Sequence, residues 1–138
     1  MKHAITIHTN VDAPLENVWS CYTNPEHVIK WNQASPDWHS PWGKNDLRTG
    51  GEFVYRMESK DGKQGFDFGG KYDEVREHEL IAYTMGDERK VSVEFEPYHG
   101  KIRVTVTFEP ETMNPVEFQQ AGWQSILDSF KKHTEECK

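Results

Sequence analysis

Apolar and polar residues alternate along much of the chain, and an apolar period of two predicts half-buried β-strands. The first such segment carries Ile5, Ile7 and Thr9 on one face. Five later segments show the same alternation: 53–57, 66–72, 81–85, 91–95 and 102–108. Short turn sequences such as Asp61-Gly62 separate them, which predicts hairpin connections and an antiparallel meander.

Two short stretches after the first strand have helical spacing instead. Asp12 is the expected N-cap of the first, Pro14 falls in its first turn, and apolar residues recur at helical spacing over 15–22. Asn24-Pro25 repeats this start signal for the second stretch. Both stretches are therefore predicted to be short amphipathic helices that interrupt the sheet.

The chain ends in the longest predicted helix, in which the apolar period becomes 3.6 from Val116 onward. One face of this helix carries Gln119, Trp123, Ile126, Leu127 and Phe130. No other predicted element is long enough to cover the apolar face of the sheet. We therefore expect an α+β fold in which a curved antiparallel sheet wraps around the C-terminal helix. No internal repeat, low-complexity tract or linker divides the chain, so a single domain over 1–138 is expected.

Residues 32–50 differ in composition from the rest of the chain. They are rich in Ser, Pro, Asn, Asp and Gly and include Trp38 and Trp42. A connection this long exceeds the usual ~4–6 residues, and long loops in compact domains tend to be functional or mobile. We therefore expect an irregular loop here.

The charge balance excludes two classes of partner. Sixteen Lys and Arg against 23 Asp and Glu give a formal net charge of −7. A net acidic chain lacks the positive surface that nucleic acid or an anionic membrane requires, so we expect neither as a partner. No apolar run approaches the ~18 residues of a membrane span. Cys21 and Cys137 are too few for a disulfide framework, and we expect two reduced thiols in a cytoplasmic protein.

Several segments in this order resemble a known family. They are Ala13-Pro14-Leu15-Glu16-Asn17-Val18-Trp19, Thr23-Asn24-Pro25-Glu26, Trp31, Arg48-Thr49-Gly50-Gly51 and Gly122-Trp123. Together they resemble the START-like helix-grip (SRPBCC) superfamily, and within it the bacterial single-domain relatives of the C-terminal domain of the heat-shock chaperone ATPase activator. The resemblance runs from about Ile5 to Phe130. It implies the helix-grip fold of the birch-pollen allergen and the aromatic polyketide cyclases, with two short helices after the first strand.

Aromatic residues make up 12% of the chain, enough to build a core and to line a cavity between sheet and helix. The candidate ligand-binding residues come from the second helix, the loop after it, the inward strand positions and the last helix. They are Trp31, Trp38, Trp42, Tyr55, Met57, Phe66, Phe68, Tyr72, Tyr83, Met85, Phe95, Trp123, Leu127 and Phe130. Alternatively, Trp31 fills the core, and Trp38 and Trp42 hold the loop in place.

The inward side chains could either fill the space under the helix or leave a pocket. Gly70 removes a side chain from the middle of the inward face, which favours a pocket. Buried tyrosine hydroxyls also need hydrogen-bond partners, and a ligand or water can supply them. We therefore expect a pocket, without a cofactor.

Other candidate chemistry is weak. By strand alternation Asp67 points away from the inward face, and Arg48 is expected to pair with Asp46 or Glu52 and fix the loop. The seven histidines are His3, His8, His27, His39, His78, His99 and His133. They include no His-x-x-x-His pair on a helix and no cysteine nearby, so we expect no metal site. We also assign no catalytic residue.

Three functions remain in consideration. The first is non-catalytic binding of a small hydrophobic or aromatic ligand, which the apolar inward set favours. The second is a cyclase or hydratase type of enzyme, in which His39 or Tyr83 would exchange a proton. The third, a chaperone-associated stress-response protein with a chaperone as partner, is implied by the resemblance alone.

Overall fold

The computed structural model describes residues 3–137. In chain order its elements are β1 (Ile5–Val11), α1 (Leu15–Thr23), α2 (Pro25–Trp31), β2 (Trp38–His39), β3 (Gly43–Asn45), β4 (Glu52–Ser59), β5 (Gly65–Arg76), β6 (Leu80–Met85), β7 (Lys90–Tyr98), β8 (Lys101–Phe108) and α3 (Val116–Glu136). The predicted strands and helices are all present. The expectation of an irregular loop over 32–50 is wrong, because β2 and β3 lie there and both pair with β4. Strands of two and three residues are too short to produce a recognisable alternation.

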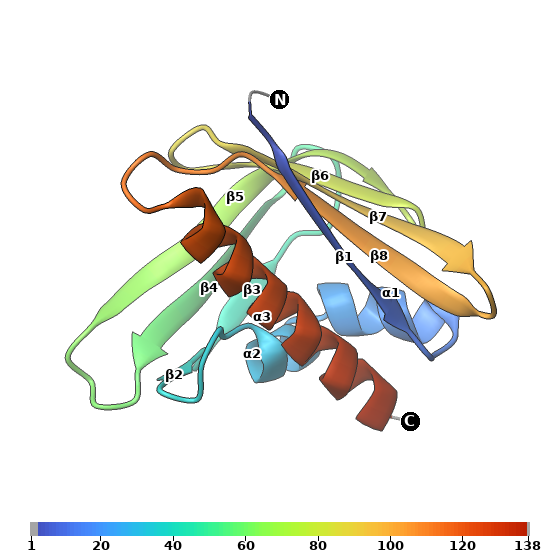
Figure 1. Ribbon diagram of the computed structural model, residues 1–138, viewed down its shortest axis with the longest axis horizontal. Coiled ribbons are helices and arrows are strands. Elements are labelled where there is room, and N and C mark those ends of the chain that lie inside the picture. Colours follow the sequence, from blue (N-terminus) through green and yellow to red (C-terminus); the bar gives the residue numbers. More distant parts are fainter. Residues whose placement is uncertain (1–2, 138) are drawn as a thin grey trace.

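The eight strands of the described residues form one antiparallel sheet in the order β1-β8-β7-β6-β5-β4-β2, with β3 also paired to β4. The first strand lies at one edge, where it pairs with the last strand and sets Ile7 opposite Val106. A register shift between Tyr72 and Glu74 in β5 adds local twist. The resulting sheet curves around the helices (Figure 1).

The alternation that predicted the strands matches their burial. In β8, Ile102, Val104, Val106 and Phe108 are buried, and the residues between them are half-buried. Because successive side chains on a strand point to opposite faces, this pattern turns one continuous apolar face toward the helices.

The starts of α1 and α2 differ from each other. The prediction that Asp12 caps α1 is wrong: Pro14 occupies the N-cap position and no side chain caps this helix. The backbone N–H of Asp12 instead donates to a carboxylate oxygen of Glu135 at 2.8 Å, which ties this turn to α3. The second start signal is confirmed, since Asn24 accepts a 3.0 Å hydrogen bond from the backbone N–H of Glu26.

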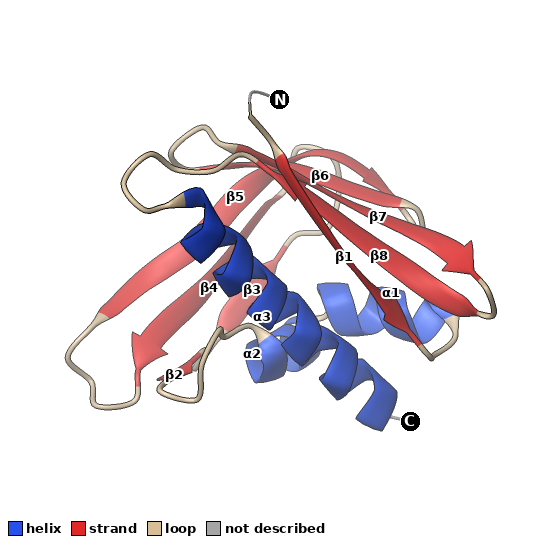
Figure 2. Cartoon of the chain, viewed as in Figure 1, coloured by secondary structure: helices blue, strands red, loops and turns tan. Residues whose placement is uncertain are grey.

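The long helix α3 crosses the concave side of the sheet, and α1 and α2 lie beside it (Figure 2). The Trp123 indole stacks on the Phe108 ring, with centroids 4.3 Å apart and planes inclined by 7°. Farther along the helix, Phe130 is fully buried and packs edge-on against Tyr22 and Trp31, at 5.0 Å from each ring. These aromatic contacts fix the helix to both the sheet and the short helices.

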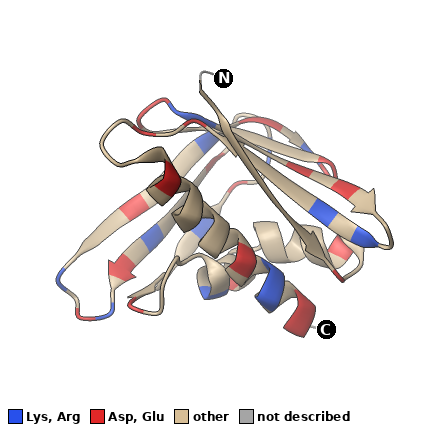
Figure 3. Ribbon diagram, viewed as in Figure 1, with Lys and Arg blue, Asp and Glu red and all other residues tan. Residues whose placement is uncertain are grey.

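Charged residues of both signs are spread along the strands and lie near the C-terminal end of α3 (Figure 3). Asp67 points outward as expected and pairs with Arg56 at 3.2 Å, while Arg56 also contacts Glu58 at 2.9 Å. Arg48 pairs with Asp46 at 2.9 Å, which is one of the two pairings expected from the sequence. No helix in the described part of the chain has the length and apolar character to span a membrane.

Candidate functional site

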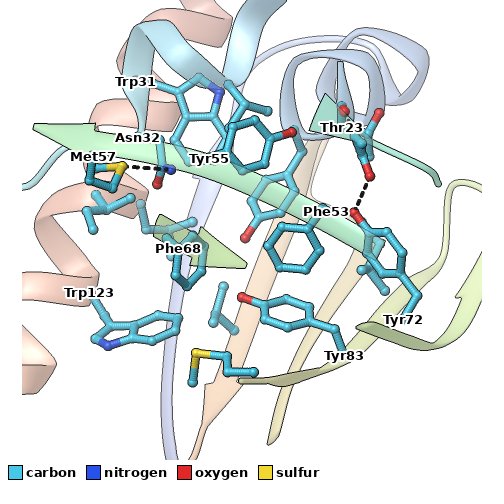
Figure 4. A pocket seen from close by; sticks show the side chains of 18 of the residues that line it. Thr23, Trp31, Asn32, Phe53, Tyr55, Met57, Phe68, Tyr72, Tyr83 and Trp123 are labelled. Atoms are coloured by element: carbon cyan, nitrogen blue, oxygen red, sulfur yellow. Dashed lines mark hydrogen bonds between the residues drawn. The ribbon is translucent and has the colours of Figure 1, made fainter. Parts of the chain in front are cut away.

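A cavity of about 260 Å³ lies between the sheet and α3. Ten of the candidate residues line it: Trp31, Tyr55, Met57, Phe66, Phe68, Tyr72, Tyr83, Met85, Trp123 and Leu127. Most of the aromatic residues that alternation and helical spacing predict to point inward therefore line this cavity. In Figure 4 the labelled side chains from α3, β4, β5 and β6 surround one common space.

Phe53 stands at the centre of this wall, although it was absent from the candidates. Its ring lies 4.9 Å from that of Tyr83, 5.2 Å from that of Tyr72 and 5.7 Å from that of Phe68. It lies two residues before Tyr55 on β4 and therefore on the same face of the strand, so the alternation that selected Tyr55 could have found it.

Four candidates lie outside the cavity lining. Phe95 packs against Trp19 of α1 at 5.2 Å, and Phe130 is fully enclosed between helices. Both point inward as expected, but the two short helices fill the space that they face. Trp42 is 44% exposed, and Trp38 lies on β2 at 5.8 Å from the Phe66 ring. The two loop tryptophans are therefore not among the lining residues, and Trp38 lies beside Phe66, which is.

Gly70 does not open the pocket, contrary to the expectation from the sequence. A Cβ atom at this position would lie 2.7 Å from the backbone carbonyl oxygen of Thr84 and 3.2 Å from the Phe53 ring. The space above Gly70 is therefore already taken by Phe53. The glycine allows close packing rather than creating the cavity.

Polar side chains that the sequence did not single out also line the cavity, among them Asn32, Asn45 and Arg89. The Tyr72 hydroxyl donates a 2.6 Å hydrogen bond to the side-chain carbonyl oxygen of Asn45. Asn45 in turn donates from its amide nitrogen to the backbone carbonyl of Thr23 at 2.7 Å. Asn45 lies on β3, Asn32 at the end of α2 and Arg89 between β6 and β7, where no apolar pattern marks an inward position.

Four tyrosines face this interior. Burial raises the pKa of Tyr22, Tyr55, Tyr72 and Tyr83 well above the ordinary value of a phenol, because the ionised form loses its hydration. Their hydroxyls are therefore protonated at neutral pH and can donate hydrogen bonds. Of these four hydroxyls, only that of Tyr72 has a hydrogen-bond partner among the described residues, so the hydroxyls of Tyr55 and Tyr83 are free to hydrogen-bond with a ligand.

Phe66 marks the side on which the cavity meets solvent. It lines the cavity, yet 51% of the residue is exposed. It lies near the end of the β4–β5 hairpin, next to Trp38. A ligand that enters on this side would pass the aromatic rings of Phe66 and Trp38.

Only one of the two residues considered for proton transfer, His39 and Tyr83, lines the cavity. His39 lies on β2, where its Nε2 is 3.9 Å from a Glu58 carboxylate oxygen, and it does not line the cavity. Tyr83 does line the cavity. Apart from the tyrosines, Arg89 is the single ionisable residue in the lining among the described residues, and it is held by Asp87 at 2.7 Å. The cavity wall thus offers hydrogen-bond donors around an apolar space.

A second cluster lies outside this cavity. Cys21, His27, His133 and Cys137 come together where the three helices meet, and one potential ligand atom from each lies within 4.8 Å of the others. The expectation that no histidine lies near a cysteine is therefore wrong here. His133 and Cys137 are four residues apart at the end of α3, a spacing that puts both on one helix face. A search for mixed His-x-x-x-Cys pairs would have found this half of the cluster.

Comparisons with known proteins agree with this architecture. A family model described as Activator of Hsp90 ATPase homolog 1-like protein matches residues 12–135. An AHSA1-like protein from Aeromonas hydrophila has a solution structure that is 39% identical in sequence, with a TM-score of 0.91 over 96% of this chain and 92% of that one. No curated protein is similar to the chain.

Two further solved structures are similar. A protein from Cytophaga hutchinsonii is 48% identical, with a TM-score of 0.84 over 96% of this chain and 92% of that one. A protein from Nitrosomonas europaea is 21% identical, with a TM-score of 0.84 over 98% and 96% of the two chains, and this similarity concerns the fold alone. The predicted helix-grip fold is thereby confirmed.

Proposed function

The chain belongs to the family of Activator of Hsp90 ATPase homolog 1-like proteins, and we propose that it binds a small hydrophobic or aromatic ligand between its sheet and α3. The observation that carries this proposal is the cavity of about 260 Å³ with its aromatic wall. An engineered apolar cavity of about 150 Å³ accommodates benzene, so this larger space suits a molecule of one or two rings or a short acyl chain.

The polar groups of the wall suggest how such a ligand would be oriented. The protonated hydroxyls of Tyr55 and Tyr83 can donate to an oxygen substituent, while Phe53 and Trp123 contact the apolar body. Burial of ligand surface at about 25 cal/mol/Å² would supply most of the affinity. Binding is favoured over catalysis because the described lining includes no carboxylate or imidazole to act as a base.

The proposal is tested with 2-naphthol as probe, measured by isothermal titration calorimetry. The wild-type chain is expected to bind one equivalent, and Tyr55→Ala and Trp123→Ala are expected to change its affinity because both side chains line the cavity. Trp42→Ala is the matched control, since Trp42 is exposed and lies outside the lining.

The same question can be asked without choosing a ligand. Native mass spectrometry of the freshly purified chain, followed by solvent extraction, would show a co-purified small molecule directly. Absence of both a co-purified molecule and 2-naphthol binding, or equal affinity in all three variants, would contradict the proposed site.

A second candidate function is contact with a chaperone, as the family description suggests. Three exposed apolar residues close together in sequence, before and at the start of α3, support it: Met113 is 89% exposed, Phe118 69% and Val116 46%. Exposed apolar residues so close together favour a protein contact. Pull-down of the purified Hsp90-type chaperone of the host should succeed with the wild-type chain and fail with Phe118→Ser. Failure with the wild type would remove this candidate.

A further inference from the structure

Four side chains that can bind a metal meet at one end of the helical layer, away from the ligand cavity. Cys21 comes from α1, His27 from α2, and His133 and Cys137 from the end of α3. The Nδ1 atom of His27 lies 3.0 Å from the Nε2 atom of His133 and 4.0 Å from the Sγ atom of Cys137. All four potential ligand atoms lie within 4.8 Å of one another.

We propose that Cys21, His27, His133 and Cys137 form a structural Zn²⁺ site. Zinc in such sites is tetrahedral, with bonds of about 2.3 Å to sulfur and 2.0–2.1 Å to nitrogen, so its ligand atoms lie about 3.3–3.8 Å apart. The separations of 3.0 Å and 4.0 Å in this cluster bracket that range. Two thiolates with two imidazoles in tetrahedral geometry favour zinc among the divalent metals.

The elements that carry the ligands are held in place independently of a metal. The indole N–H of Trp31 donates to the backbone carbonyl of Cys21 at 2.8 Å, which joins α2 to α1. At the end of α3, the Glu135 carboxylate accepts hydrogen bonds from the backbone N–H of Asp12 at 2.8 Å and from Lys131 at 2.7 Å. The cluster is therefore preorganised, and small side-chain movements suffice to bring the four atoms to tetrahedral positions.

Neutral imidazoles and thiolates are the forms of these side chains that bind zinc. Binding would release one proton from each cysteine, and the two thiolates would balance the charge of Zn²⁺.

The site would connect the three helices at the point where they converge, because each contributes at least one ligand. Cys21 is buried, whereas Cys137 is only partly shielded and lies just beyond the end of α3. A metal can therefore enter past Cys137. The proposal is independent of the ligand cavity, since none of the four residues lines it.

The test uses the full chain, reduced and freed of metal, with Zn²⁺ and Co²⁺ as the probes. We expect native mass spectrometry to show one Zn²⁺ per chain and zinc to raise the melting temperature. Co²⁺ should give the visible bands of a tetrahedral ion and a thiolate-to-metal charge-transfer band. The last band reports sulfur ligation, which binding to surface carboxylates would not produce.

Cys137→Ser and His27→Gln are the informative variants, because neither side chain belongs to the buried core. Each should weaken zinc binding by at least about tenfold, since even the loss of an outer-shell partner costs about 10–100-fold. His8→Gln is the matched control, because His8 is an exposed histidine of β1 and should leave zinc binding unchanged.

Three results would overturn the proposal. The first is equal zinc affinity in the wild type, Cys137→Ser and His27→Gln. The second is a Co²⁺ complex without the charge-transfer band. The third is a Cys21–Cys137 disulfide, with no titratable thiol, in the chain as isolated from cells.

Discussion

The Tyr72 hydroxyl donates a 2.6 Å hydrogen bond to the side-chain carbonyl oxygen of Asn45, and this contact joins β5 to the short strand β3. Asn45 also donates to the backbone carbonyl of Thr23 at 2.7 Å. The Asn45 side chain therefore connects β3, β5 and the end of α1. Tyr72, Asn45 and Thr23 all line the cavity, so these hydrogen bonds shape one side of it.

Asn45→Ala should lower the free energy of unfolding by about 1–3 kcal/mol, because a part-buried hydroxyl and a carbonyl lose their partner together. Tyr72→Phe removes only one hydrogen bond and should cost less. Urea unfolding monitored by circular dichroism measures both. Asn17→Ala is the control: Asn17 is exposed and should change stability by less than about 0.5 kcal/mol. An Asn45→Ala variant as stable as this control would show that the linkage contributes nothing.

Substituting alanine at two glycines should change the stability of the fold in opposite directions. Gly70→Ala should destabilise the fold by about 1–3 kcal/mol, because the new Cβ would meet the carbonyl oxygen of Thr84 at 2.7 Å and the Phe53 ring at 3.2 Å. Gly122→Ala should stabilise it by about 0.5–1 kcal/mol, because Gly122 lies within α3 and nothing lies within 4 Å of a Cβ there. Thermal and urea unfolding of both variants check this. A neutral Gly70→Ala would mean that Phe53 can move away without cost.

Most of the fold could be predicted because its elements are long and regular. Alternation over 102–108 identified a strand with one buried face, and the helical spacing from Gln119 to Phe130 identified the helix that covers the sheet. Asn45 could not be found in this way, since a three-residue strand has no period.

The candidate site shows the limit of these patterns in another way. Alternation correctly predicts that Phe68 and Phe95 point inward, but it does not predict what each of them contacts there. Phe95 lies beneath α1, and Phe68 faces the cavity. The position of a short helix over a sheet depends on contacts between segments far apart in the sequence. For the same reason the sequence does not indicate that His27 and His133 meet, although their ring centroids lie 5.2 Å apart.

The stability of the chain should fall at alkaline pH because of its buried tyrosines. Burial raises the pKa of Tyr22, Tyr55, Tyr72 and Tyr83 in the folded state, whereas the unfolded chain ionises near pH 10. Above pH 10 the unfolded state therefore binds fewer protons than the folded state, so raising the pH favours unfolding. The tyrosine contribution is fully present below pH 10 and is lost as the pH rises toward the folded pKa values.

Urea unfolding between pH 8 and pH 11 measures this effect, and tyrosinate absorbance of the folded and unfolded chains follows the ionisation itself. We expect a folded chain that ionises at higher pH than the unfolded one. Tyr83→Phe should reduce the alkaline loss of stability, because one of the four shifted groups is gone. Identical absorbance titrations of the folded and unfolded chains would contradict the buried environment of these hydroxyls.

The last prediction concerns the hydroxyl of Tyr83, which lines the cavity without a hydrogen-bond partner among the described residues. If it orients a ligand, Tyr83→Phe should weaken binding of 2-naphthol by about twofold to twelvefold, which corresponds to one hydrogen bond of about 0.5–1.5 kcal/mol. Naphthalene, which has no oxygen, should bind the wild type and the variant equally. Calorimetric titration of both probes measures the difference, and Tyr98→Phe, which changes an exposed tyrosine, is the control. Equal losses for both probes would mean that Tyr83 shapes the cavity but does not orient its ligand.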